Sequence, residues 1–125
     1  MELKEDSTLP LYIQIAELIE DQILEDIIKE GEQVYSTNEL SVILQVNPAT
    51  ARKGLNLLVD DDILYKKRGV GMFVKKGAVQ KIKSKRVNNF FDEYIRELLQ
   101  EGKKLGIGKQ EIIHMIESYG GKVDK

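Results

Sequence analysis

The sequence has no cysteine in its 125 residues. Disulfide bonds and thiolate chemistry are therefore excluded, and the absence fits a reducing compartment. The chain also lacks an apolar run of about 18 residues, which a membrane-spanning helix needs, and its acidic start is unlike a signal peptide. We expect a soluble, cytoplasmic protein that has no membrane partner.

Histidine is almost as scarce, since His114 is the only one. Zinc there would depend on carboxylates for its other ligands, so we expect a surface or interface histidine and no metal site. The glycines at 69 and 71 are not followed closely by a helix, as a phosphate-binding loop would be. No nucleophile–base pair and no carboxylate dyad stands out. We therefore predict that the protein is not an enzyme and binds no cofactor.

The sequence does contain enough apolar material for one folded domain, or for a small domain with an appendage. Hydrophobic residues make up 42% and charged residues 32% of the chain. This composition predicts a packed core and argues against disorder. We find no internal repeat and no low-complexity tract.

Charge is unevenly distributed, although the net charge is only −2. Residues 1–35 carry 10 acidic and 2 basic side chains, residues 36–86 carry 4 acidic and 11 basic ones, and residues 87–125 carry 7 acidic and 6 basic ones. A basic middle region favours a polyanionic partner. Chance segregation of charges on solvated faces would produce the same pattern, so charge alone leaves both interpretations open.

The first helix is predicted to begin after Pro10, which suits a first helical turn. Gly31 ends this segment. Apolar residues recur within it at three- and four-residue steps, as on one face of a helix of about five turns. These residues are Leu11, Ile15, Leu18, Ile19, Ile23 and Ile27.

A second, short helix is predicted to begin at a capping-box pattern. Ser36 is followed three residues later by Glu39, so the Ser36 hydroxyl should accept a hydrogen bond from the Glu39 amide. The helix should end before Asn47, because a residue that precedes proline is disfavoured in the helical conformation.

A third helix should run from the N-cap Asn47 and the first-turn Pro48 to about Val59. Gly54 lies in its middle, where glycine costs roughly 1 kcal/mol relative to alanine, which indicates close packing. The helix has an inner stripe and an outward face. The inner residues are Ala51, Leu55 and Leu58, and the outward ones are Thr50, Arg52, Lys53 and Asn56.

Residues 63–75 comprise two β-prone runs around a turn that holds Gly69 and Gly71, which predicts a hairpin. Lys66, Lys67 and Arg68 flank this turn. Helix, helix, turn, helix and hairpin is the order of a winged helix-turn-helix domain, whose second paired helix enters the DNA major groove. We predict such a domain for residues 1–76, in a fold that is mainly α with a small β-hairpin wing (α+β).

Residues 77–125 are predicted to form a two-helix dimerisation tail. Residues 77–86 are basic and fit either a linker or a helix start; the next helix should stop at Gly102, and the last at Gly120 and Gly121. The apolar stripe is broader than two helices can cover, which predicts packing against a second subunit, with docking onto the winged domain as the alternative. The expected interface residues are Phe90, Phe91, Tyr94, Ile95, Leu98, Ile112 and Ile116.

The first 75 residues resemble the DNA-binding domain of the GntR family of bacterial transcription regulators. The resemblance rests on PLYIQI at 10–15, Gly31, STNEL at 36–40, VNPAT at 46–50 and RGVGMFV at 68–74. The short tail is similar to that of the YtrA-like subfamily. This resemblance implies a homodimer, a two-fold symmetric operator in double-stranded DNA and, usually, repression.

Three positions depart from the family pattern. The family usually has Pro-Ser-x-Arg where this chain has residues 35–38, so Asn38 replaces a charged contact with a weaker one. Asp62 replaces a glycine before the first wing strand, and aspartate tolerates a left-handed conformation better than most residues. Met72 replaces a small polar residue. We expect these changes to affect base preference and affinity but not the fold.

The expected DNA-binding residues lie in the helix pair and the wing. The resemblance implies that Arg52 contacts DNA, and the wing turn offers Arg68 and Gly69. Thr50 should either bond a phosphate or support the helix start, whereas Lys53 fits a plain surface charge. Ser36 and Asn47 are helix caps first and phosphate contacts second. The full set is Ser36, Asn38, Asn47, Thr50, Arg52, Lys53, Arg68 and Gly69.

The leading functional hypothesis is a homodimeric transcription repressor that occupies an operator. The alternative is a winged-helix module for protein interaction whose DNA binding is weak or lost. A third interpretation adds an unidentified small-molecule effector, bound between the tail and the winged domain.

Overall fold

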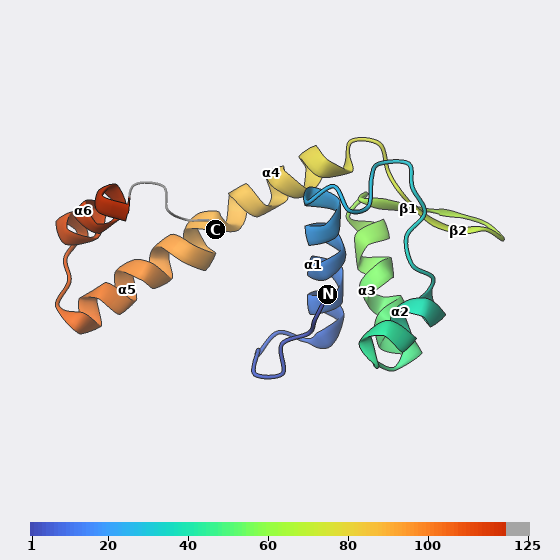
Figure 1. Ribbon diagram of the computed structural model, residues 1–125, viewed down its shortest axis with the longest axis horizontal. Helices are drawn as coiled ribbons and strands as arrows, with labels where there is room; N and C mark the ends of the chain where they lie inside the picture. Colours follow the sequence, from blue (N-terminus) through green and yellow to red (C-terminus); the bar gives the residue numbers. More distant parts are fainter. Residues whose placement is uncertain (120–125) are drawn as a thin grey trace. The chain divides into compact units, whose positions relative to one another are not determined.

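The computed structural model describes residues 1–119, and it divides the chain into two compact units, residues 1–84 and residues 85 onward. Figure 1 labels the elements in chain order. They are α1 (Leu11–Leu24), α2 (Thr37–Leu44), α3 (Pro48–Asp60), β1 (Leu64–Lys67), β2 (Gly71–Val74), α4 (Ala78–Phe90), the π-helical turn η1 (Phe91–Ile95), α5 (Arg96–Leu105) and α6 (Lys109–Tyr119). The fold class predicted from the sequence is confirmed.

Helix α1 buries Ile15, Ile19 and Ile23, which recur every fourth residue on one face. The expectation that this helix extends past Ile27 is wrong. It ends at Leu24, because Asp26 takes a left-handed conformation with φ of 63°. Ile27 is consequently 59% exposed.

Helices α2 and α3 begin as the sequence predicts. The Glu39 amide donates to the Ser36 hydroxyl over 3.0 Å, and the Ser36 amide donates to the Glu39 carboxylate over 2.8 Å, which completes the capping box. The Ala49 amide donates to the Asn47 side chain over 2.8 Å. Each cap stabilises its helix by about 1 kcal/mol, because it satisfies an amide that has no partner within the helix.

Gly54 allows α3 to pack closely on α1, as the sequence predicts. A Cβ at this position would lie 2.8 Å from Cγ2 of Ile15 and 3.0 Å from the carbonyl oxygen of Tyr12. On either side of the glycine, Ala51, Leu55 and Leu58 are buried. Burial of each leucine contributes roughly 1.5–3 kcal/mol.

The wing is an antiparallel hairpin in which Leu64 pairs with Val74 and Lys67 with Gly71. Before β1, Asp62 adopts φ of 65°, the left-handed conformation expected there. Its carboxylate lies 2.8 Å from the Nζ atom of Lys75, and the hydrogen bond and charge of this lysine lower the pKa of Asp62.

Residues 77–84 belong to the first compact unit, which therefore extends past the expected boundary after residue 76. They form the start of α4, and Ala78 and Ile82 are buried. The Glu30 carboxylate accepts hydrogen bonds from the amides of Gly77 and Val79, at 3.0 and 3.1 Å, and these bonds lower the pKa of Glu30. The sequence left open whether this segment is a linker or the start of a helix, and in the structure it is the start of a helix.

The second compact unit comprises the end of α4, η1, α5 and α6. The expected helix stop at Gly102 is wrong, because α5 continues to Leu105 and Gly106 ends it with φ of 74°. Gly102 instead lies close to the chain that follows, since a Cβ there would be 3.0 Å from both the Ile107 carbonyl oxygen and Cδ1 of Ile112. The expected stop at Gly120 and Gly121 lies outside the described residues.

Candidate nucleic-acid interface

Helix α3 presents one polar face to solvent. Arg52, Lys53 and Asn56 are exposed, and Thr50 is half-buried. The buried stripe on the opposite side fixes how the helix is rotated, so these side chains must point away from the core. Two of them carry positive charge, as a helix that approaches phosphates would require.

A hollow of about 220 Å³ lies between the start of α2, α3 and the wing. It brings Arg52 together with Ser36, two of the residues expected to contact DNA, and its polar lining adds Asn56 and Lys66. The remaining lining residues are Tyr35, Thr37, Leu55, Gly71 and Met72. Segments 35–37, 52–56, 66 and 71–72 thus form one concave surface.

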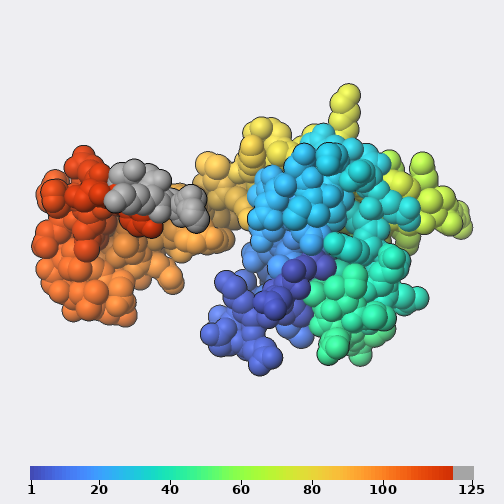
Figure 2. All heavy atoms as spheres, in the orientation of Figure 1, coloured from blue at the N-terminus to red at the C-terminus, as the bar shows by residue number. Residues whose placement is uncertain are grey.

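The other expected residues lie outside this hollow. Asn38 and Asn47 are exposed at the starts of α2 and α3, and the side-chain oxygen of Asn47 accepts the capping hydrogen bond from the Ala49 amide. Arg68 and Gly69 occupy the turn between β1 and β2, where Gly69 has φ of 77°. In Figure 2 the wing, in yellow-green, projects on the same side of the first unit as α2 and α3, in teal and green.

Among the residues that the structure describes, the cations of this surface differ from several others in the chain by having no carboxylate partner. Lysines at 29, 75, 81 and 104 and the arginine at 96 lie within 4.0 Å of a carboxylate oxygen. Within residues 1–119, the side chains of Arg52, Lys66 and Arg68 form no such pair. Their charge is therefore not neutralised locally, and it can act on a phosphate backbone.

Two lysines are held by aromatic rings. The Nζ atom of Lys53 lies 4.1 Å from the ring centroid of Tyr12, in α1, and that of Lys67 lies 5.0 Å from the ring of Phe73. Such contacts contribute about 0.5–1 kcal/mol at exposed sites. Lys53 thus contacts α1, and its expected role as a plain surface charge stays a prediction.

Lys66 was not among the residues expected to bind DNA, yet it lines the hollow. The signal was present in the alternation of β1. Lys66 pairs with Met72 and shares a strand face with the buried Leu64, whereas Tyr65 and Lys67 face the other way. Tyr65 stacks on Phe73 on that other face, with ring centroids 5.7 Å apart.

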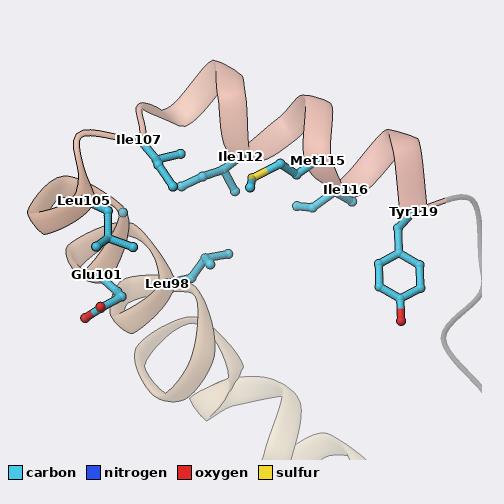
Figure 3. A pocket seen from close by; sticks show the side chains of 9 residues that line it. Leu98, Glu101, Leu105, Ile107, Ile112, Met115, Ile116 and Tyr119 are labelled. Carbon is cyan, nitrogen blue, oxygen red and sulfur yellow. The ribbon is translucent and has the colours of Figure 1, made fainter.

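The second unit has a different surface. Phe90, Phe91, Tyr94, Leu98 and Ile116 are exposed, Ile95 is half-buried and Ile112 is buried. An apolar pocket of about 260 Å³ lies between α5 and α6, with Leu98 pointing from α5 toward Ile112 and Ile116 of α6 (Figure 3). Its other lining residues are Glu101, Gly102, Leu105, Ile107, Met115 and Tyr119.

Within the described part of the chain, no three histidine, aspartate or glutamate side chains gather as metal ligands, and His114 is exposed. None of the helices between residues 1 and 119 combines the length and the apolar character that crossing a membrane requires.

The packed helices α1–α3 and their hairpin define a winged helix-turn-helix domain. Residues 11–74 match the family model described as bacterial regulatory proteins, gntR family. The chain belongs to the GntR family, and it is a transcriptional regulator with a winged-helix DNA-binding domain.

Known proteins resemble the chain, two of them over most of its length and one over the DNA-binding part alone. The repressor YtrA of Bacillus subtilis is 24% identical over 94% of this chain and 89% of its own length. A GntR family transcriptional regulator from Listeria monocytogenes has a TM-score of 0.73 and 28% identity, over 90% of this chain and 97% of that one. The DNA-binding domain of AraR, in complex with its operator ORX1, has a TM-score of 0.53 and 32% identity, over 59% of this chain and 92% of that one.

Proposed function

We propose that the protein is a homodimeric repressor that binds a two-fold symmetric operator in double-stranded DNA. The observation that carries the proposal is the single concave surface on which Arg52 and Lys66 converge beside the start of α2. A helix with exposed cations enters the major groove, while the adjacent wing reaches the backbone or the minor groove. Such a function requires the compartment that holds the DNA, which in a bacterium is the cytoplasm.

Each expected residue has a separate task in this proposal. Arg52 reads base edges or a phosphate from the outer face of α3, Asn38 adds a neutral contact from α2, and Arg68 and Gly69 contact the backbone from the wing. Thr50, Lys53 and the caps Ser36 and Asn47 hold phosphates and fix the register. The AraR domain supports this use of the fold, because its complex contains operator DNA.

Operator fragments are first obtained by letting the protein enrich them from genomic DNA. The test then measures how tightly Arg52→Ala and Arg68→Ala bind these fragments. Loss of a good base contact costs about 1–3 kcal/mol, so Arg52→Ala should bind about 5- to 150-fold more weakly. Arg68→Ala, which loses a backbone contact, should also bind more weakly, and its affinity should depend less steeply on salt. Lys29→Ala is the control, because Lys29 is also exposed but is paired with Asp26. If both arginine variants bind as tightly as the parent, the proposed interface is wrong.

Salt dependence separates this proposal from the alternative of a module for protein interaction. Neutralisation of phosphates makes affinity fall steeply with salt, by roughly one logarithmic unit per contact for each tenfold rise in salt. A parent protein that binds no genomic duplex, even at low salt, would favour the alternative.

The proposed dimer rests on the surface of the second unit. Among residues 85–119, only Gly102 and Ile112 are buried, so the unit lacks a core of its own. Exposed apolar surface of this extent marks an interface. We infer that Phe90, Phe91, Tyr94, Ile95, Leu98, Ile112 and Ile116 meet the same surface of a second copy.

Sedimentation of the full chain tests this inference. Ile116→Glu should shift the protein from dimer to monomer, because a carboxylate would be buried without a partner in the interface. Ser118→Glu, two residues away and outside the lining of the pocket, is the control and should stay dimeric. A dimeric Ile116→Glu protein would contradict the inference.

Binding of an unidentified small-molecule effector stays a prediction, which a thermal-shift screen of metabolites would test.

A further inference from the structure

A loop segment ahead of α2, residues 31–34, pairs with β2 of the wing. The Gly31 amide donates to the Val74 carbonyl over 2.8 Å, and the Val34 amide donates to the Met72 carbonyl over 2.9 Å. Between them, Gln33 forms a bridge with Phe73. A two-stranded hairpin is marginally stable by itself. The pairing of this segment with β2 therefore supports the wing in addition to the burial of Leu64 and Val74 in the core.

The side chain of Gln33 reaches further, to the tip of the wing. Its Nε2 atom donates to the Val70 carbonyl over 3.0 Å, across 37 residues of sequence. Gly71, next in the chain, has φ of 145°, and a Cβ there would lie 2.5 Å from the same Nε2 atom. A side chain at position 71 would displace the amide end of Gln33, so glycine there leaves the bond to Val70 undisturbed.

The carbonyl that Gln33 binds belongs to the turn that carries Arg68, one of the wing's cations. The Val70 amide donates to the Lys67 carbonyl over 2.9 Å, which closes a turn around Arg68 and Gly69. The amide of Val70 thus bonds within the turn and its carbonyl bonds to Gln33. Gln33 therefore connects this turn directly to the loop that ends at Ser36, the N-cap of α2.

We propose that Gln33 is a positioning residue that holds the wing tip at a fixed place relative to the helix pair, so that Arg68 meets DNA in register with α3. Gln33 acts through Val70 and touches no DNA in this proposal, which rests on the proposed function of the wing. Fixing the tip before binding reduces the ordering that complex formation requires.

The experiment is a double-mutant cycle on operator binding with Gln33→Met and Arg68→Ala. Methionine has a similar length but no donor, so it removes the bond to Val70 without emptying the space. We expect Gln33→Met to weaken binding about fivefold, the effect of one hydrogen bond. In the Arg68→Ala background the same change should weaken binding less than twofold, because the contact that Gln33 positions is already absent.

Controls separate positioning from general destabilisation. Gln80→Met places the same side chain on the exposed face of α4 and should bind DNA like the parent. Gln33→Met that binds like the parent, or that weakens binding equally in both backgrounds, overturns the proposal.

A measurement on the free protein keeps this inference separate from the proposed function. Backbone ¹⁵N relaxation should show lower order parameters for Gly69 and Val70 in Gln33→Met than in the parent. If the parent binds no operator, the proposed function fails, but this measurement still tests whether Gln33 restrains the wing tip. Unchanged order parameters would show that it does not, and would overturn the proposal.

Discussion

The two units of the chain bury their apolar residues to very different extents. The first unit encloses isoleucines, leucines and valines from α1, α2, α3, the hairpin and the start of α4 in one cluster. In the second unit, Phe90, Phe91 and Tyr94 remain more than half exposed. The first unit thus encloses an apolar core, whereas the described residues of the second unit leave most of their apolar side chains exposed.

The largest expected effect comes from Leu55→Ala, in the core of the first unit. Leu55 is 1% exposed, so its truncation should lower the free energy of unfolding by about 2–5 kcal/mol. Urea denaturation followed by circular dichroism measures the change. Val42→Ala, at a position that is 76% exposed, should stay within about 0.5 kcal/mol of the parent. Equal losses in both variants would contradict the contrast between core and surface.

Gly54→Ala tests the close contact between α3 and α1. Overpacking against Ile15 and the Tyr12 carbonyl costs about 1–3 kcal/mol, which exceeds the roughly 1 kcal/mol that alanine gains in helix propensity. The melting temperature of the first unit should therefore fall. A higher melting temperature would mean that the helices separate at little cost.

Gly102→Ala is the matching change in the second unit. Its Cβ would press on the Ile107 carbonyl oxygen and on Ile112, and would push α6 away from α5. We expect dimerisation to weaken about tenfold, by analogy with other overpacked contacts, while the unfolding of residues 1–84 is unchanged. Analytical ultracentrifugation at several concentrations measures the first effect. A variant that unfolds the first unit instead would show that the two units depend on each other.

Asn38→Arg, in the first unit, should raise the affinity of the protein for DNA. The added charge should strengthen operator binding about fivefold. It should also make the slope of log affinity against log salt concentration more negative by about one. Fluorescence anisotropy at three salt concentrations measures both quantities. Ser118→Arg adds the same charge in the tail and should change neither. Binding that weakens in Asn38→Arg would show that Asn38 faces a site with no room for arginine.

The smallest effect is expected from Glu30→Gln, through the dependence of stability on pH. The folded state lowers the pKa of Glu30, so this carboxylate stabilises the fold above its ordinary pKa, and the contribution disappears as pH falls through the folded value. The parent should therefore lose more stability than Glu30→Gln between about pH 6 and about pH 3. Thermal melts across this range measure the difference, and parallel curves would contradict the role of Glu30 as a cap for α4.

Local sequence signals predicted the helix starts, the hairpin and the outward face of α3, because each depends on near neighbours in the chain. The capping box at Ser36 and the inner stripe of α3 are such signals. The errors occurred where a single backbone conformation overrides a pattern. Asp26 ends α1 although the apolar stripe continues to Ile27, and Gly102 packs inside a helix that it was expected to stop.

Contacts between distant segments were beyond the reach of sequence patterns. The cation–π contact of Lys53 with Tyr12, the bond from Gln33 to Val70 and the place of Lys66 in the hollow all join residues from different elements. No periodicity records such pairs, since it reports only which side of one element faces inward.

The sequence by itself determined the order of elements of a winged helix-turn-helix domain and the apolar stripe of the tail, because caps, turns and hydrophobic periods are local properties; the role as a regulator came from resemblance to a family. Only the tertiary structure decided which cations meet in one hollow and what holds the wing in place. Packing across segments far apart in sequence sets those distances, and it depends on the whole core at once.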